Sequence, residues 1–211
     1  MVVSTGESPR ASPADSKMPS IYGQAQTLHK LLDDRGVALR KIEPARAAAI
    51  AALSEGNFDI LHIVCHGSAE LDDINSAQLI IGERAVGGGK MEPISIDPVT
   101  VGQEARMALQ QRRPIVFLNA CESGRQGASL TAWGGWPTAF LKAGANVFVG
   151  AAWPVREAPA AAFATAFYTT LLEGKTLVEA TNAARAAARI FPDASWISYR
   201  VFGHPQARMS V

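Results

Sequence analysis

Three short, almost wholly apolar segments limit the fold of this chain most strongly. Segments 59–65, 115–120 and 146–151 have no polar–apolar alternation, so each is typical of a strand buried on both faces. Apolar periodicity and helix-start and helix-stop residues predict helices between and around them. This alternation predicts an α/β fold with a mostly parallel sheet covered on both faces. Helices are expected over 22–35, 44–53, 98–111, 133–143, 158–173 and 176–190, and further strands over 37–42, 79–81 and 199–202.

The first 20 residues differ in character from the rest. Residues 1–4 resemble the tail of a strand, and residues 5–20 form a Ser- and Pro-rich loop. A chain that starts within an element is typical of a domain cut from a larger protein, so we expect a longer parent chain. Residues 21–211 are expected to form one domain, because single domains of roughly 200 residues are common.

Composition and charge exclude several classes of function. The chain has 211 residues, 48% of them hydrophobic, and 20 Lys and Arg residues against 19 Asp and Glu residues. The net charge of +1 gives no basic footprint for nucleic acid or for an anionic membrane surface. The charge-poor region 126–155 contains five glycines and two prolines, so we interpret it as buried helix and strand rather than a membrane span.

The cysteines indicate the compartment. Only Cys65 and Cys121 are present, too few for a disulfide scaffold, and no signal-peptide pattern occurs. We therefore expect a reducing cytoplasm.

Functional residues are expected just after the buried strands, because ligands of open α/β sheets bind beyond the carboxyl ends of the strands. The first strand is followed by His66 and Gly67, the second by Cys121, and the third by Trp153. If the first two strands are neighbours, their ends lie only about 5 Å apart. This spacing brings an imidazole within reach of a thiol and predicts a nucleophile and its base.

The chemistry of a cysteine nucleophile explains why such a pair is useful. A thiol with an ordinary pKa of roughly 8.5 becomes mostly thiolate only beside a cation or a helix amino terminus, and His66 could supply the cation. The backbone N–H groups of Gly67 and Cys121 are expected to hold the oxyanion. The competing interpretation is a buried structural cysteine with a turn histidine.

Three motifs mark the ends of the buried strands: LHIVCHG at 61–67, LNACESG at 118–124 and AWPV at 152–155. Together they resemble a known family, the CHAT-domain caspase-like cysteine peptidases. The resemblance covers nearly the whole chain and implies a caspase-like three-layer αβα sandwich. It also implies a cysteine endopeptidase that uses His66 as base and Cys121 as nucleophile. The resemblance extends through FLKAGA at 140–145, Phe167–Tyr168 with Leu171–Leu172, and 199–203.

The resemblance further implies a biological setting. Members are often joined to TPR repeats, and some act in anti-phage defence, so a bacterial effector released by a sensor or TPR-type module is expected. The partner of the reaction is a protein substrate. No cofactor is needed.

The resemblance also points to residues of the substrate pocket. In caspases the residue two positions before the nucleophile lines this pocket, and strand alternation places Asn119 on the same side as Cys121. The family commonly has two acidic residues after Trp-Pro-Val, where this chain has Arg156 and Glu157. We therefore take Asn119, Trp153, Arg156 and Glu157 as the predicted substrate-binding residues, with no preference for a basic substrate residue implied.

Two other motifs are set aside. His62 and His66 lie roughly 13 Å apart on a strand, so no metal site is expected, and His62 is predicted to be buried and hydrogen-bonded. Cys65 is predicted to face the core, away from His66. Residues 87–90 suggest a phosphate loop, but Arg84 and Met91 replace its glycine and its hydroxyl residue, so a flexible loop is predicted instead.

Two alternative functions stay open. One is a caspase-like interaction module without catalysis. The other is an α/β-hydrolase-type thiol esterase that uses Cys121, a later acid such as Glu157, and His204, although Asn119 and Ser123 stand where its elbow needs glycine. Segments 72–93 and 124–132 are predicted activation or self-cleavage loops, because they are rich in glycine and lie near the site.

Overall fold

A computed structural model of the chain describes residues 21–68, 77–122, 135–153 and 155–209, with the backbone alone for residues 21–25, 66–68, 121 and 122. The predicted strand remnant and Ser/Pro-rich loop at 1–20 lie outside these residues. So do residues 72–76 of the first predicted activation loop and the whole of the second.

One mixed sheet organises the described residues. Its strand order is β3-β2-β1-β4-β5-β6, and β1 pairs with β4, and β4 with β5, in parallel. β2 and β6 run opposite to the other four strands, so the sheet is mostly parallel, as predicted. The elements are α1 (Ile21–Asp33), α2 (Arg46–Glu55), β1 (Ile60–Ser68), β2 (Gln78–Ala85), β3 (Met91–Ile96), α3 (Pro98–Glu104), the 3-10 helix η3 (Ala108–Gln110), β4 (Ile115–Glu122), α4 (Gly135–Ala143), β5 (Val147–Ala151), α5 (Glu157–Leu172), α6 (Leu177–Ala188), α7 (Ser195–Ser198) and β6 (Tyr199–Phe202).

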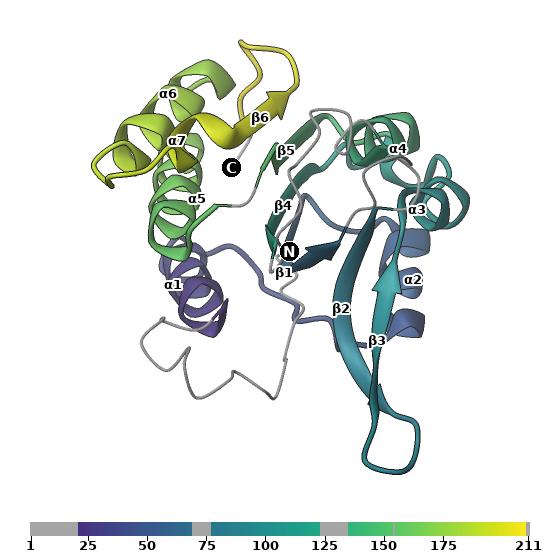
Figure 1. The fold of residues 1–211 in the computed structure, drawn as a ribbon. Coiled ribbons are helices and arrows are strands. Elements are labelled where there is room, and N and C mark those ends of the chain that lie inside the picture. Colours follow the sequence, from purple (N-terminus) through teal and green to yellow (C-terminus); the bar gives the residue numbers. More distant parts are fainter. Residues whose placement is uncertain (1–20, 69–76, 123–134, 154, 210–211) are drawn as a thin grey trace.

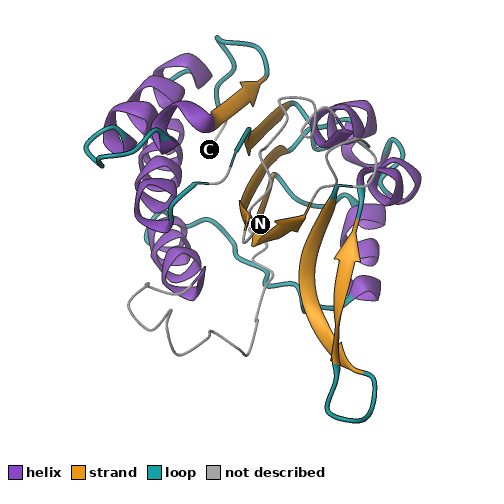
Figure 2. Cartoon of the chain, in the orientation of Figure 1, coloured by secondary structure: helices purple, strands orange, loops and turns teal. Residues whose placement is uncertain are grey.

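Helices cover both faces of this sheet (Figures 1 and 2). α2, α3 and α4 lie on one face and α1, α5 and α6 on the other. Alternate strand residues enter separate apolar clusters: Leu61 and Leu118 join the α2 side, whereas Ile60 and Phe117 join the α5 side. The continuous apolar strands are therefore explained, because both of their faces are buried.

The predicted strand at 37–42 is wrong. These residues are not in a strand; they connect α1 on one face of the sheet to α2 on the other. Val37 and Leu39 pack against the α5-side cluster and Ile42 belongs to the α2-side cluster. The apolar pattern therefore reflects anchoring in two cores rather than pairing in a sheet.

The segment around three consecutive glycines also differs from the prediction. Residues 86–90 are the turn of a β2–β3 hairpin, and Gly87, Gly88 and Gly89 all have positive φ. β2 is longer than predicted, and β3 was not predicted at all. A positive φ at three successive positions is a turn conformation that glycine adopts without strain.

The predicted helix at 98–111 is interrupted. α3 ends at Glu104, and Met107 takes a left-handed φ of 60° before η3 begins. Asp97 caps α3, since its side chain accepts a hydrogen bond of 2.6 Å from Thr100 N. The helix periodicity alone gave no signal for the break at Met107.

Candidate active site

The backbone register of β1 and β4 places the two predicted catalytic residues side by side. The strands pair in parallel from Ile60 opposite Ile115 up to Gly67 opposite Glu122, and His66 lies opposite Cys121. Paired strands lie about 4.8 Å apart. The condition on which the predicted pair depends, that these two strands are neighbours, is therefore met, and both positions lie at the carboxyl ends of the strands.

Strand alternation places both residues on one face of the sheet. His62, four positions before His66, packs on Phe117, four positions before Cys121, with 4.8 Å between ring centroids. Because residues two or four apart in a strand share a face, positions 66 and 121 lie on the side covered by α1, α5 and α6.

His62 lies buried on this same face, between the sheet and α5. It is 2% exposed, and its Nδ1 shares a hydrogen bond of 3.0 Å with the hydroxyl of Tyr168 on α5. Burial, and to a smaller extent the charge of His29, lowers the pKa of His62 to about 3. Burial likewise raises the pKa of Tyr168. His62 is therefore neutral at ordinary pH, and its predicted place as a buried, hydrogen-bonded residue is confirmed.

Cys65 takes the opposite face, as predicted. It is buried in the α2-side cluster with Leu61 and Ile63. The two cysteines thus occupy different environments, one in the core and one at the end of β4.

Asn119 lies two positions before Cys121 and is only 1% exposed. Its Oδ1 accepts a hydrogen bond of 2.8 Å from the hydroxyl of Tyr199, the first residue of β6. The side chain is therefore held in the protein interior, and its predicted contact with substrate stays a prediction.

The other predicted pocket residues follow β5. Trp153 lies three residues beyond Gly150 and Cys121 three residues beyond Leu118, and Gly150 pairs with Leu118. Trp153 is therefore at the same level of the sheet edge as Cys121. Arg156 immediately precedes α5 and its side chain is 79% exposed, and Glu157 starts that helix half-buried.

Residues that the sequence analysis did not single out hold this segment in place. They come from Asp193 to Tyr199 and include Ser195 and Ser198, both buried. Their partners lie about 40 residues earlier in the chain, so no local spacing could have revealed them. The one signal in the sequence for these contacts was the presence of Ser195 and Ser198 between the helix predicted over 176–190 and the strand predicted over 199–202.

His204, the base of the esterase alternative, lies at the other edge of the sheet. β6 runs antiparallel to β5, with Tyr199 opposite Ala151 and Phe202 opposite Phe148. Phe148 pairs in turn with Val116, five residues before Cys121. The end of β6 is therefore roughly 17 Å from the level of Cys121, given 3.3 Å per strand residue, and His204 lies two residues beyond that end. The fold therefore does not bring together the residues that this alternative needs.

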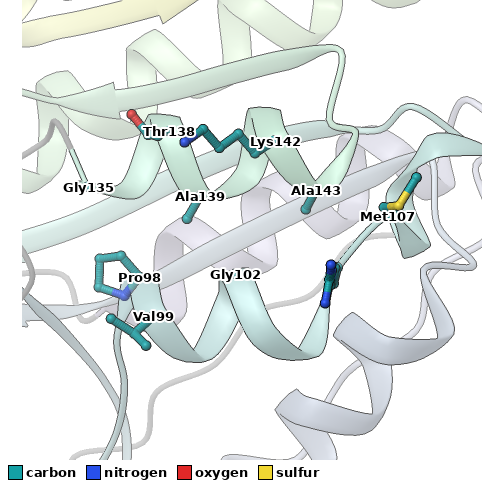
Figure 3. Close-up of a pocket in the computed structure, with 10 residues that line it drawn as sticks. Pro98, Val99, Gly102, Met107, Gly135, Thr138, Ala139, Lys142 and Ala143 are labelled. Atoms are coloured by element: carbon teal, nitrogen blue, oxygen red, sulfur yellow. The ribbon is translucent and has the colours of Figure 1, made fainter.

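The face that carries α3 and α4 has a separate open groove of about 680 Å³ (Figure 3). It is on the side of the sheet opposite to positions 66 and 121. Its described lining is apolar apart from Thr138, Arg106 and Lys142, so it holds no nucleophile with a base. The lining residues are Pro98, Val99, Gly102, Arg106, Met107, Gly135, Thr138, Ala139, Lys142 and Ala143.

The described part of the chain offers neither a cluster of metal ligands nor a membrane-spanning helix. No group of three or more His, Cys, Asp or Glu side chains there could hold a metal ion. None of its helices combines the length and the apolar character that crossing a membrane requires.

Comparison with known proteins identifies the family and the fold. The family model of the CHAT domain matches residues 6–196. The crystal structure of the Arg-specific cysteine proteinase gingipain R is similar, with a TM-score of 0.62 and 16% identity. The match covers 98% of this chain but 46% of the proteinase chain, so this chain spans less than half of that length. A comparison with curated proteins found no match. The chain therefore belongs to the CHAT domain family, and its fold is that of a caspase-like cysteine proteinase.

Proposed function

We propose that this chain is a cysteine endopeptidase in which His66 and Cys121 form the catalytic dyad. The observation that carries the proposal is the parallel register, which sets His66 directly opposite Cys121 at the carboxyl edge of the sheet. Membership of the CHAT family and the caspase-like fold support the same chemistry. The alternative of an interaction module without catalysis is addressed by the experiments below.

In the proposed reaction His66 takes the proton of the Cys121 thiol, and the thiolate sulfur attacks the scissile carbonyl carbon. The backbone N–H groups of Gly67 and Cys121 stabilise the resulting oxyanion. The C–N bond then breaks, and the imidazolium of His66 gives its proton to the leaving amine. Water attacks the thioester, releases the new carboxyl terminus and restores the thiol.

Trp153, Arg156 and Glu157 are proposed to contact the substrate, because Trp153 follows β5 at the level of Cys121 and the other two lie in the connection from there into α5. Asn119 is the fourth proposed pocket residue. The similar proteinase is described as Arg-specific. Here the most exposed of the pocket side chains is itself an arginine, Arg156, whose positive charge favours an acidic substrate side chain over a basic one.

We also propose the setting in which the enzyme works. A regulated bacterial effector, controlled by a sensor or TPR-type module, is consistent with the CHAT family. A reducing cytoplasm suits a catalytic thiol in a chain that has only two cysteines.

The first test needs no substrate. Alkylation of Cys121 by iodoacetamide is followed by mass spectrometry across pH, with buried Cys65 as the internal control. The expected apparent pKa of Cys121 lies well below about 8.5 and returns toward that value in His66→Ala, because the imidazolium no longer stabilises the thiolate. An apparent pKa that is ordinary and identical in both proteins would contradict the dyad.

The second test is cleavage of a peptide library. Cys121→Ala and His66→Ala are each expected to lower kcat/KM by about three orders of magnitude or more, because the nucleophile and its base act as a unit. Circular dichroism should show that both variants keep the fold. Full activity in either variant would rule out the assignment, and no cleavage by the parent protein would favour the interaction module.

A further inference from the structure

The segment Asp193–Tyr199, which we name the α7 segment, is hydrogen-bonded to the residues that follow β5. Ser198 is fully buried, and its Oγ both accepts from Trp153 N at 3.1 Å and donates to Trp153 O at 2.9 Å. The carbonyl of Ser198 accepts from Ala152 N at 2.9 Å. One serine therefore binds both backbone polar groups of Trp153, which fixes the position and direction of that residue.

The same segment also holds the start of α5. Ser195 Oγ accepts from Arg156 N at 3.3 Å, and Asp193 Oδ2 lies 3.8 Å from Arg156 Nε. Asp193 Oδ1 in turn accepts from Ser195 N at 2.8 Å. Arg156 makes no side-chain cap for α5 itself, so Ser195 satisfies a backbone amide at the entry to that helix.

At its other end the α7 segment reaches β4. The Tyr199 hydroxyl donates to Asn119 Oδ1 at 2.8 Å, two positions before Cys121. Tyr199 stacks on Phe163 of α5, with 3.9 Å between ring centroids, so its own position is fixed by packing. A continuous stretch of seven residues thus ties the end of β4 to the segment after β5.

We propose that the α7 segment is the positioning element of the substrate pocket, with Ser198 as its central residue. This inference rests on the proposed function and adds the part of the chain that sets the shape of its site. The groups of the α7 segment do not react; they hold Trp153 and Arg156 where a substrate would meet them, and they fix the buried Asn119 two positions before Cys121. Such supporting hydrogen bonds matter because a binding group displaced by about 1 Å can cost about 100-fold in rate.

The first experiment measures the support directly. Hydrogen exchange of the amides of Ala152, Trp153 and Arg156 is compared in the parent protein, Ser198→Ala and Ser195→Ala. In Ser198→Ala the amide of Trp153 should exchange about fivefold faster or more, and in Ser195→Ala the amide of Arg156 should do so, because each loses one hydrogen bond to a side chain. The Ala152 amide, which is bonded to the backbone carbonyl of Ser198, shows whether the whole α7 segment has moved away. The control is Thr181→Val, which also removes a buried hydroxyl but one that donates only within α6, to Leu177 O. It should leave these amides unchanged.

The second experiment separates pocket shape from the reactivity of the dyad. Labelling of Cys121 is measured with iodoacetamide and with peptidyl acyloxymethyl ketones that carry an acidic, a basic or an apolar residue next to the reactive group. In Ser198→Ala and Tyr199→Phe the peptidyl probes should label about tenfold more slowly, whereas iodoacetamide should react within about twofold of the parent rate. Thr181→Val should resemble the parent protein with both reagents.

The outcomes distinguish this inference from the proposed function. Unchanged exchange and unchanged peptidyl labelling in Ser198→Ala would overturn the positioning role. An equal loss of iodoacetamide and peptidyl labelling would also overturn it, because the effect would then lie in the dyad or the fold. If no peptidyl probe labels the parent protein, the proposed function fails, and the exchange of Ala152, Trp153 and Arg156 alone decides whether the α7 segment holds them.

Discussion

At the scale of single residues, His62 makes the stability of the protein depend on pH. It is held neutral in the core against Phe117 and Tyr168, and its pKa falls from an ordinary 6.5 to about 3. The unfolded chain therefore binds one more proton than the folded chain between these two pKa values. Stability from this residue is fully present above pH 6.5 and is lost as the pH falls toward 3.

We predict that His62→Gln reduces this acid sensitivity. The amide of Gln can bond Tyr168 but does not titrate. Between pH 6.5 and about 4.5 the parent protein should lose about 2 kcal/mol more stability than the variant, at about 1.4 kcal/mol per pH unit of full effect. Urea denaturation at each pH measures the difference. His204→Gln, which removes an exposed histidine, is the control, and equal acid sensitivity in parent and His62→Gln would refute the prediction.

Strand alternation predicted on which face of the sheet some side chains lie, but it did not predict which distant residues bind them. It placed His62 and Cys65 on opposite faces, and both placements hold in the structure. The partners of Asn119 and Trp153 could not be predicted, because Tyr199 and Ser198 reach them through the fold from 80 and 45 residues away. The pattern of buried strands predicted that positions 66 and 121 lie side by side, and the register confirms it. The roles of His66 and Cys121 as base and nucleophile come from the family resemblance and stay predictions.

At the scale of elements, α6 shows how a helix start is specified locally. Thr176 and Glu179 form a reciprocal capping box: Thr176 Oγ accepts from Glu179 N at 3.3 Å, and Glu179 Oε2 accepts from Thr176 N at 2.8 Å. These bonds satisfy backbone donors that the helix cannot pair internally.

We predict that Thr176→Ala lowers the free energy of unfolding by about 1 kcal/mol, because it removes the hydroxyl of this box. The change is measured as a lower urea midpoint at an unchanged slope. Thr176→Ser keeps the hydroxyl and should recover most of the loss. A serine variant as unstable as the alanine variant would show that the methyl group, not the cap, is what matters.

Elements with a clear local pattern were predicted well, and those that depend on distant contacts were not. β1, β4 and β5 are mostly apolar runs, α5 is a long alanine-rich segment, and α6 has one apolar face. β3 contains Pro93 and the polar residues Glu92 and Ser95, so it lacks a strand pattern and pairs only because the hairpin turn returns it to β2. Residues 37–42 show the reverse case: they have the apolar pattern of a strand, but they pack against the two cores and do not pair with any described strand of the sheet.

At the scale of the whole molecule, the sheet separates two apolar cores. Leu109 belongs to the core beneath α2, α3 and α4, and Leu171 to the core beneath α1, α5 and α6. Both side chains are buried, and they belong to different clusters.

We predict that Leu109→Ala and Leu171→Ala each cost about 2–5 kcal/mol, and that the costs add to within about 0.5 kcal/mol in the double variant. Additivity follows because the two residues share no cluster. Denaturant unfolding of the four proteins gives the coupling energy. A coupling well above this margin would mean that the sheet transmits repacking from one core to the other.

The position of β6 in the chain has a consequence for biosynthesis. Among the described strands, β5 has β4 on one side and β6 on the other. Because β6 is translated after every other strand of the sheet, a nascent chain that has released β5 still presents an open edge, with its backbone groups unpaired. β5 gains its second neighbour, and Tyr199 reaches Asn119, only when the segment up to Phe202 has left the ribosome. Synthesis of β6, the last of the described strands in chain order, thus ends the period in which the edge of β5 is free to pair with another chain.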